Sequence, residues 1–198
     1  VRGAMQAYRD ALKDLHAVKP QRMRDVLLAQ VYLSRYVLGR DLDEAMRLMD
    51  EGDDAYDYSV AWIDLTASGG AMGRSILDRG RFASLDQLDP AARREPLTFR
   101  PGTLATAPKL VPPRLINRFT VKAFNEAWYR LAPRRRRAAL QSITEFFHPL
   151  DRVDRWNRLY GRAGVLQWQF VVPDHETETL REIVGELSRA GCPSFLAV

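Results

Sequence analysis

Gln167 and Gln169 are the residues of this sequence whose type and spacing are best suited to binding a polar ligand. They stand two apart in residues 165–172, an alternating run that predicts a β-strand. Their side chains should therefore project from one face while apolar side chains line the other. Neighbouring carboxamides can donate to and accept from the hydroxyl groups of a sugar. The pattern indicates a sugar-binding strand or an ordinary strand face in water, and periodicity alone favours the latter.

Three further side chains could add to such a site. Trp62 falls on the aromatic face of a strand predicted over residues 56–65, where the commoner role is that of a core residue. Phe147 and His148 precede Pro149 and could line a cleft. A structural histidine with satisfied hydrogen bonds is the commoner alternative for His148.

A run of arginines at 134–137 stands out in a chain whose net charge is +5 and whose pI is about 9.6. Such runs usually form solvated loops, and that is the expectation here. The alternative is contact with phosphate or with an anionic membrane surface, which would make the protein peripheral to a membrane. No nucleic-acid recognition motif accompanies the charge, so nucleic acid is not expected as a partner.

Common catalytic motifs are missing from the sequence. It has no GxGxxG, GxxxxGK[ST], HExxH, CxxC or GxSxG pattern, and its histidines lack metal-ligand spacing, so no metal site is expected. The lone Cys192 cannot form an intrachain disulfide, which fits a reducing compartment. No window is long and apolar enough for a membrane span, and the first residues lack the apolar core of a signal peptide. We expect a cytoplasmic or membrane-peripheral protein.

Periodicity and breaker residues divide the chain into helices and strands. Helices are predicted over residues 5–16, 41–49, 118–131, 153–160 and 174–190, and strands over 56–65, 74–80, 144–148, 165–172 and 194–198. Residues 86–113 are rich in proline and should follow an irregular course. The order predicts an α+β fold, a mostly antiparallel sheet covered by helices on one face.

The proposed domain boundary falls near Asp41, which with Glu44 forms a capping-box pattern at the start of a helix. Residues 1–40 are interpreted as an N-terminal helical segment of unclear affiliation, although residues 32–38 are rich in strand formers. Residues 41–198 form the main domain.

Several separate segments carry a resemblance to a known family. They are YDYSVAWIDL, MGRSILDRG, AFNEAWYR, EFFHPLDRVDRWNRLYG and AGVLQWQFVVP, in that order. Together they resemble the decaprenylphosphoryl-β-D-ribose 2′-oxidase family, FAD-linked oxidases of the vanillyl-alcohol-oxidase-like class. The resemblance covers roughly residues 41–198 and implies the substrate-binding domain of a two-domain flavoenzyme.

The resemblance also implies a reaction and a set of site residues. A hydride would pass from the ribose 2-carbon of a polyprenyl-phosphoryl ribose to the flavin. A short-chain reductase partner would then complete epimerisation toward cell-wall arabinan. The positions matched to the family's sugar pocket are Trp62, Phe147, His148, Leu150, Gln167 and Gln169. The family has tyrosine where this chain has Phe147, so a hydroxyl contact is lost there.

Other parts of the family pattern have no match in this sequence. The glycine-rich flavin segment, the reactive-site cysteine and the catalytic lysine are missing, and Cys192 does not match that cysteine by its neighbours. The FAD that the resemblance implies would thus be bound by other residues, and no catalytic or cofactor-binding residue is assigned. We expect a truncated chain that is inactive alone. The alternative is a sugar-phosphate-binding module without catalytic activity.

Overall fold

The computed structural model describes residues 31–96, 102–112, 115–133, 135–173, 175–191 and 193–198. The helix predicted over residues 5–16 lies outside these ranges. No helix in the described ranges has the length and apolar character that a bilayer crossing requires.

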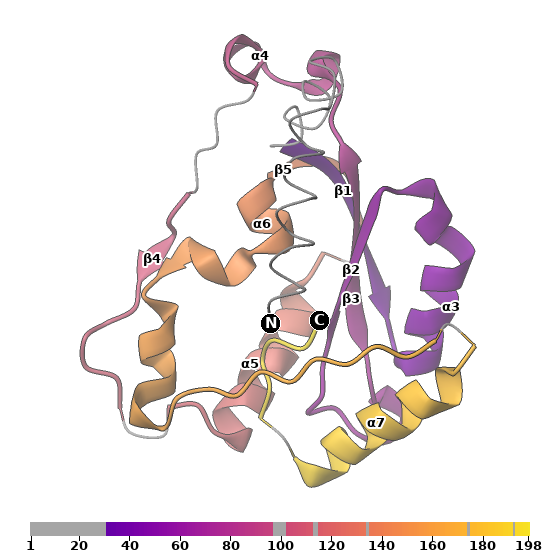
Figure 1. The fold of residues 1–198 in the computed structure, drawn as a ribbon, viewed down its shortest axis with the longest axis vertical. Helices are drawn as coiled ribbons and strands as arrows, with labels where there is room; N and C mark the ends of the chain where they lie inside the picture. Colours follow the sequence, from indigo (N-terminus) through magenta and orange to yellow (C-terminus); the bar gives the residue numbers. More distant parts are fainter. Residues whose placement is uncertain (1–30, 97–101, 113–114, 134, 174, 192) are drawn as a thin grey trace, which may run out of the picture.

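An antiparallel four-stranded sheet forms the centre of the fold, in the order β2-β3-β1-β5 (Figure 1). Its strands are β1 Val31–Gly39, β2 Tyr58–Ile63, β3 Ser75–Phe82 and β5 Arg135–Ser142. Helices pack on this sheet, so the predicted α+β class with an antiparallel sheet is confirmed. The strands predicted over residues 56–65 and 74–80 correspond to β2 and β3.

Strand β1 lies in the interior of the sheet, paired with β3 on one side and β5 on the other. The sheet therefore begins ahead of the boundary predicted near Asp41. Residues 31–39 are strand, which corrects their assignment to a helical N-terminal segment. The strand-forming composition of residues 32–38 was the better guide, because aromatic and β-branched side chains favour strands.

Helix α3, Leu42–Gly52, follows β1 directly. Its N-cap is Asp41, whose carboxylate accepts a hydrogen bond from the backbone N–H of Glu44 at 2.8 Å, as the capping pattern predicts. The helix packs with α7, Thr177–Ala190, around a core of Leu42, Leu65 and Val184. Figure 1 shows α3 and α7 on one side of the sheet, and α5 and α6 on the other, so helices lie on both faces where the sequence predicted them on one.

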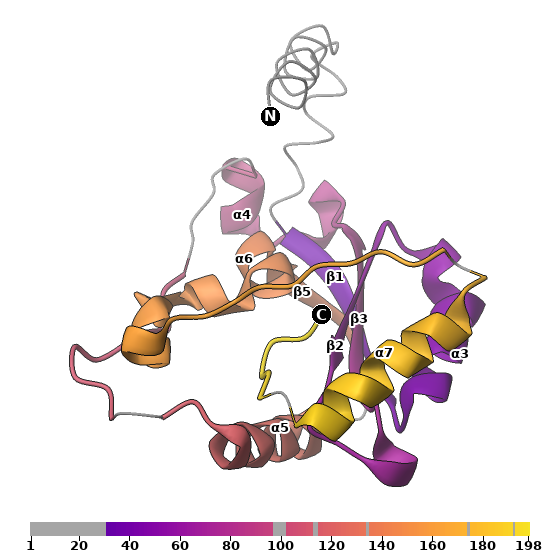
Figure 2. The same cartoon turned by 60° about the horizontal axis from the view of Figure 1, so that its bottom comes forward.

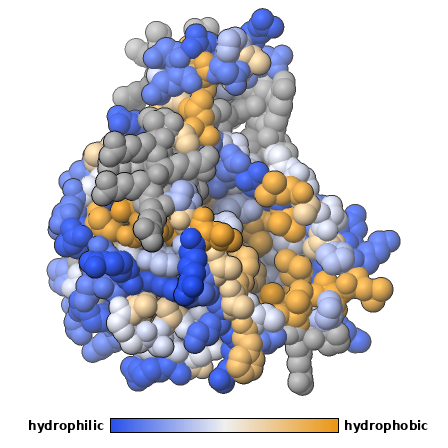
Figure 3. Space-filling view, turned by 180° about the vertical axis from the view of Figure 1, so that it is seen from behind, coloured by the Kyte–Doolittle hydropathy of each residue, from blue (hydrophilic) through white to orange (hydrophobic). Residues whose placement is uncertain are grey.

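Helix α5, Arg118–Leu131, has the predicted bounds. Its start is fixed by Asn117, whose side-chain oxygen accepts hydrogen bonds from the N–H groups of Phe119 and Thr120. Val121 and Asn125 are its buried residues, while Phe124 and Trp128 are exposed. Apolar side chains also reach the surface on the face opposite to that of Figure 1 (Figure 3).

The strand predicted over residues 144–148 is wrong, because this stretch forms helix α6, Ile143–Phe147. Ser142 and Glu145 form a capping box: the Ser142 hydroxyl accepts from the Glu145 N–H at 3.2 Å, and the Glu145 carboxylate accepts from the Ser142 N–H at 3.1 Å. These two bonds satisfy backbone donors that a strand would leave to a neighbour. Pro149 ends the helix as it would have ended the strand.

The arginine run lies in a different element from the expected loop. Its residues from Arg135 onward open β5, which pairs antiparallel with β1 through Val37 and Arg135. β5 is an edge strand, and charged side chains are common at sheet edges because they discourage further strand addition. The expectation of a solvated loop is therefore corrected for residues 135–137.

Residues 164–173, here called the extended segment, are the largest departure from the predicted fold. They cross the molecule without pairing to any described strand, as Figures 1 and 2 show. Leu166 and Val171 remain 91% and 96% exposed. The alternating pattern identified a chain able to form a strand, but a ladder also needs a neighbour that local sequence does not reveal. Residues 193–198, the C-terminal segment, likewise form no strand.

The remaining described elements are short. They are η1 Asp53–Ala55, η2 Gly69–Ala71, η3 Leu85–Gln87, α4 Pro90–Arg94, β4 Ala105–Thr106, η4 Pro149–Arg152, β6 Val153–Asp154 and η5 Trp156–Ala163. β4 and β6 form a parallel pair, which ties the proline-rich stretch to the residues before η5. The predicted helix over 153–160 corresponds to η5, a 3-10 helix that begins later.

Candidate functional site

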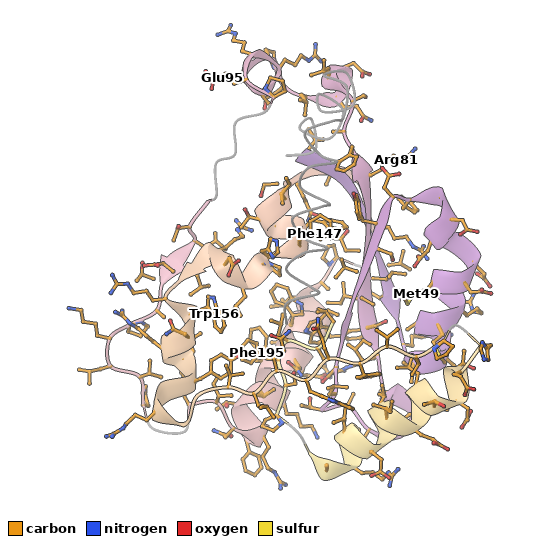
Figure 4. The ribbon with its side chains drawn as sticks, in the orientation of Figure 1. Met49, Arg81, Glu95, Phe147, Trp156 and Phe195 are labelled. Atoms are coloured by element: carbon orange, nitrogen blue, oxygen red, sulfur yellow. The ribbon has the colours of Figure 1, made fainter. Side chains whose placement is uncertain are left out.

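The aromatic face of β2 is the best-defined part of the candidate site. Tyr58 and Trp62 point to the same side of this strand because they are an even number of residues apart. The Tyr58 ring meets the Phe147 ring edge-to-face, with centroids 5.2 Å apart. It also meets the Phe82 ring, at 5.4 Å. Figure 4 shows Phe147 between α6 and the sheet.

Gly80 explains why α6 lies so close to this face. Gly80 pairs with Tyr58 across the β2–β3 ladder. A Cβ atom built on Gly80 would lie 2.7 Å from the ring of Phe146, so only glycine leaves room for that ring. Phe146 packs there, and it carries the neighbouring Phe147 and His148 to the aromatic face.

His148 and Leu150 follow Phe147 within one turn. The His148 N–H donates to the Thr144 carbonyl at 3.1 Å, which closes α6. The imidazole is exposed, with its centroid 6.3 Å from that of the Phe147 ring. Leu150 is half-buried in η4. The structure therefore brings Phe147, His148 and Leu150 together, with Tyr58 as an aromatic neighbour that the matched positions did not include.

Trp62 is a core residue in this structure. It is 9% exposed, and its indole N–H donates to the carbonyl of Phe195 at 3.0 Å. Its one hydrogen-bond donor is thus engaged within the protein. Trp62 supports the aromatic face from within and anchors the C-terminal segment.

Gln167 and Gln169 lie on the extended segment, where both are exposed. Among the residues that the structure describes, neither carboxamide makes a hydrogen bond. The predicted strand that was to present them on one face is not formed. The structure therefore does not join the glutamine pair to Phe147, His148 and Leu150.

A buried polar cluster adjoins Trp62 at the end of β2. Asp64 is 0% exposed and its carboxylate accepts hydrogen bonds from Thr66, Arg74 and Asn125. The distances are 2.6 Å from the Thr66 hydroxyl, 2.7 Å from Arg74 Nη2 and 2.8 Å from Asn125 Nδ2. These residues are called the Asp64 network.

The ionisation of the network follows from these contacts. Burial alone would raise the pKa of Asp64, but the hydrogen bonds from Thr66, Arg74 and Asn125 outweigh it, and the pKa lies below its usual value. Burial acts to lower the pKa of Arg74, and hydrogen bonds to Asp64 and Glu126 raise it above its usual value instead. The network is therefore an ion pair at neutral pH.

The Asp64 network also holds the C-terminal segment. Asn125 Nδ2 donates to the Ser194 carbonyl at 3.1 Å, and the Ile63 N–H donates to the Ala197 carbonyl at 2.9 Å. With the Trp62–Phe195 bond, the segment is fixed at three successive points beside β2. Sequence reasoning missed this arrangement. The signal was present: Asn125 is a polar residue on the buried side of α5.

Among the described residues, no group of His, Cys, Asp or Glu could hold a metal ion. The glycines of the described residues do not form a flavin site either. The glycines at 69 and 70 have open space around them, but they lie in a single 3-10 turn with no long helix whose N-terminus could receive a pyrophosphate. Gly73 is used for packing, because a Cβ there would lie 2.6 Å from Leu42.

The described residues thus form an α+β domain with an aromatic sheet face, and comparison with known proteins finds a related oxidase. The chain is 41% identical over 158 residues to decaprenylphosphoryl-beta-D-ribose oxidase of Mycolicibacterium smegmatis. This match covers 79% of the chain and 34% of that relative, so the chain spans about a third of its length. The resemblance predicted from the sequence segments is confirmed over this part of the oxidase.

A second relative gives a weaker match. The chain is 28% identical over 160 residues to a Streptomyces coelicolor protein described as an uncharacterized protein in the mprA 5′ region. The match covers 77% of the chain and 42% of that protein. No protein-family model matches the chain.

Proposed function

We propose that this chain forms the sugar-contacting part of an FAD-linked oxidase that acts on the 2-hydroxyl of a polyprenyl-phosphoryl ribose. The observation that carries the proposal is the 41% identity over 79% of the chain to an oxidase of that substrate class. The oxidation would serve the synthesis of cell-wall arabinan precursors.

In this proposal, different kinds of side chain contact different parts of the sugar. Gln167 and Gln169 are free to donate to and accept from ribose hydroxyls. The rings of Phe147 and Tyr58 provide an apolar wall of the kind on which a sugar ring packs. His148 is exposed beside that wall and can hydrogen-bond to a ligand. The flavin, when bound by other residues, would supply the hydride acceptor.

The lipid phosphate and the partners are part of the same proposal. A chain with net charge +5 attracts an anionic phosphate and an anionic membrane surface, where a polyprenyl lipid would be found. Peripheral membrane contact and a short-chain reductase that consumes the keto sugar complete the proposed setting.

Calorimetric titration of the full 198-residue chain with a short-chain polyprenyl-phosphoryl ribose tests the sugar site. We expect saturable binding that is weakened about tenfold or more when both glutamines are replaced by alanine, since each lost hydrogen bond contributes about 0.5–1.5 kcal/mol. Leu110→Ala, at an exposed position on another loop, is the matched control. Equal binding of the same lipid phosphate without its ribose would contradict recognition of the sugar.

The alternative is a binding module without catalytic activity, favoured by the lack of a flavin site among the described residues. Mixing the chain with the portion of the Mycolicibacterium relative outside the matched region distinguishes the two. Ribose-dependent reduction of a dye by the mixture, and by neither part alone, supports the oxidase. Ligand binding without any reduction supports the binding module.

A further inference from the structure

Helix α5 exposes a stripe of large apolar side chains, here called the α5 stripe: Phe124, Trp128 and Leu131. They recur at spacings of four and three residues, which places them along one side of the helix. Their side chains are 47%, 50% and 83% exposed. The Phe124 and Trp128 rings stack with centroids 5.9 Å apart, and Phe124 also meets Phe195 edge-to-face at 6.0 Å. The C-terminal segment therefore supports the stripe from within while its outer side faces solvent.

Positive charge is concentrated in the same part of the chain. Residues 109–137, which contain α5, include nine Lys or Arg residues and one acidic residue, Glu126. The whole chain has 30 basic and 25 acidic residues, so 21 basic and 24 acidic residues lie outside this range. The net charge is thus +8 within residues 109–137 and −3 in the rest of the chain. On α5 itself, Arg118, Lys122 and Arg130 are exposed.

We propose that the α5 stripe is the surface by which this chain contacts an anionic phospholipid membrane, with α5 lying in the plane of the headgroups. Helices that bind membranes in this way carry Trp, Phe and Leu on one side and Lys and Arg on the rest of their surface. Indole rings are favoured at the depth of the headgroups, and basic side chains attract acidic lipids. The long stems of Lys122 and Arg130 let their charges reach headgroups beside the stripe.

Charge selects both this occupant and this face. A membrane of acidic lipids matches the apolar stripe and the positive charge around it, whereas a neutral partner would use only the stripe. The extended segment also exposes apolar side chains, but residues 163–173 contain no charged residue, so acidic lipids do not favour it. The inference rests on the proposed function only in that it assigns the peripheral membrane contact proposed there to one face of the molecule.

Co-sedimentation of the full 198-residue chain with vesicles tests the stripe. The vesicles consist of phosphatidylcholine alone or of phosphatidylcholine with phosphatidylglycerol. We expect partitioning onto the vesicles with phosphatidylglycerol to be tighter, and to fall about tenfold or more when Trp128→Ser and Leu131→Ser are combined, because apolar side chains leave the membrane. Both positions are exposed, so the variant should fold, which circular dichroism checks. Leu166→Ser with Val171→Ser is the matched control on the extended segment and should leave partitioning unchanged.

A charge reversal on α5 tests the second part of the proposal. Lys122→Glu should weaken partitioning onto the vesicles with phosphatidylglycerol about tenfold, since it replaces an attraction by a repulsion at the membrane surface. Arg94→Glu changes the net charge by the same amount on α4, at another end of the molecule (Figure 1), and should have a much smaller effect. Equal losses for the two reversals would show that the overall charge acts without a defined face, and would overturn the proposal.

A fluorescent probe locates the contact directly. In a Cys192→Ser background, a polarity-sensitive dye on Leu131→Cys should shift its emission to the blue when vesicles with phosphatidylglycerol are added, and the same dye on Leu166→Cys should not. A chain that binds neither kind of vesicle contradicts the inference, as does binding that the paired substitutions at Trp128 and Leu131 leave intact. The calorimetric titration with the sugar lipid uses no vesicles, so a failure of sugar binding and a failure of membrane binding are separate results.

Discussion

The Asp64 network and the extended segment differ in how their side chains are held. Asp64 follows β2, Arg74 precedes β3 and Asn125 lies on α5, and in the interior the Asp64 carboxylate accepts hydrogen bonds from both of the others. Gln167 and Gln169 share one segment, and no described residue holds either of them. The network is thus fixed by neighbours distant in sequence. The extended segment has the alternating sequence of a strand, but no described strand pairs with it.

Replacing Asp64 by alanine should give the largest loss of stability in the molecule. The change takes one acceptor from the buried Arg74 guanidinium, which keeps Glu126, and one from the Asn125 amide, which keeps the Ser194 carbonyl. Breaking a buried ion pair in this way costs about 3–5 kcal/mol. Chemical denaturation measures this free energy of unfolding. Asp43→Ala is the control, because Asp43 pairs with Arg181 at the surface and its loss should be barely measurable. Similar effects for the two substitutions would show that the network is unimportant.

Trp62→Phe should have an intermediate effect. It keeps an aromatic core side chain but removes the N–H that donates to Phe195, at a cost of about 0.5–1.5 kcal/mol. The exchange of the Ile63 amide proton should also speed up, because its acceptor, the Ala197 carbonyl, lies on the segment that Trp62 anchors. Unchanged protection of Ile63 would show that the C-terminal segment is held without the indole.

Acid should weaken the network and leave the extended segment unaffected. The pKa of Asp64 is lower in the folded protein than in the unfolded chain, where it is about 3.9. The stability from this shift is therefore fully present above about pH 5 and is lost as the pH falls through the folded pKa. Urea titrations between pH 7 and pH 3 should show this decline. In Asp64→Asn, a flatter pH dependence is expected, and an unchanged one would assign the decline to other carboxylates.

Val171→Ser should have the smallest effect on the free energy of unfolding. The side chain is 96% exposed, so the change should stay within about 0.5 kcal/mol. The matched comparison is Val184→Ser on α7, which removes a core residue and should cost several times more. A large loss at Val171 would mean that the segment packs against the domain in solution.

Local sequence signals predicted the elements whose ends are marked by nearby residues, such as a capping residue or a proline. Helix α5 was predicted with its bounds from its amphipathic pattern and from Pro133, which follows it; the Asn117 cap that the structure shows was not part of the prediction. The capping box of Ser142 and Glu145 was equally readable, but the aromatic residues after it were interpreted as a strand. The clustering of Phe147, His148 and Leu150 followed from their nearness in sequence.

Contacts between distant residues could not be predicted in this way. Nothing local pairs Asp64 with Asn125, which lie 61 residues apart, or Trp62 with Phe195, which lie 133 apart. The strand predicted over 165–172 failed for the same reason. Periodicity shows which faces a strand would have but not which strand it would join.

The bonds from Trp62, Ile63 and Asn125 to the C-terminal segment have a consequence for the order of folding. They join residues up to 134 positions apart, from Ile63 to Ala197, and long loops make native contacts late and folding slow. During synthesis, β2 and α5 leave the ribosome well before Ser194 and Phe195. Until these residues have been synthesised, the buried amide of Asn125 lacks the Ser194 carbonyl as an acceptor, and the indole N–H of Trp62 lacks the Phe195 carbonyl.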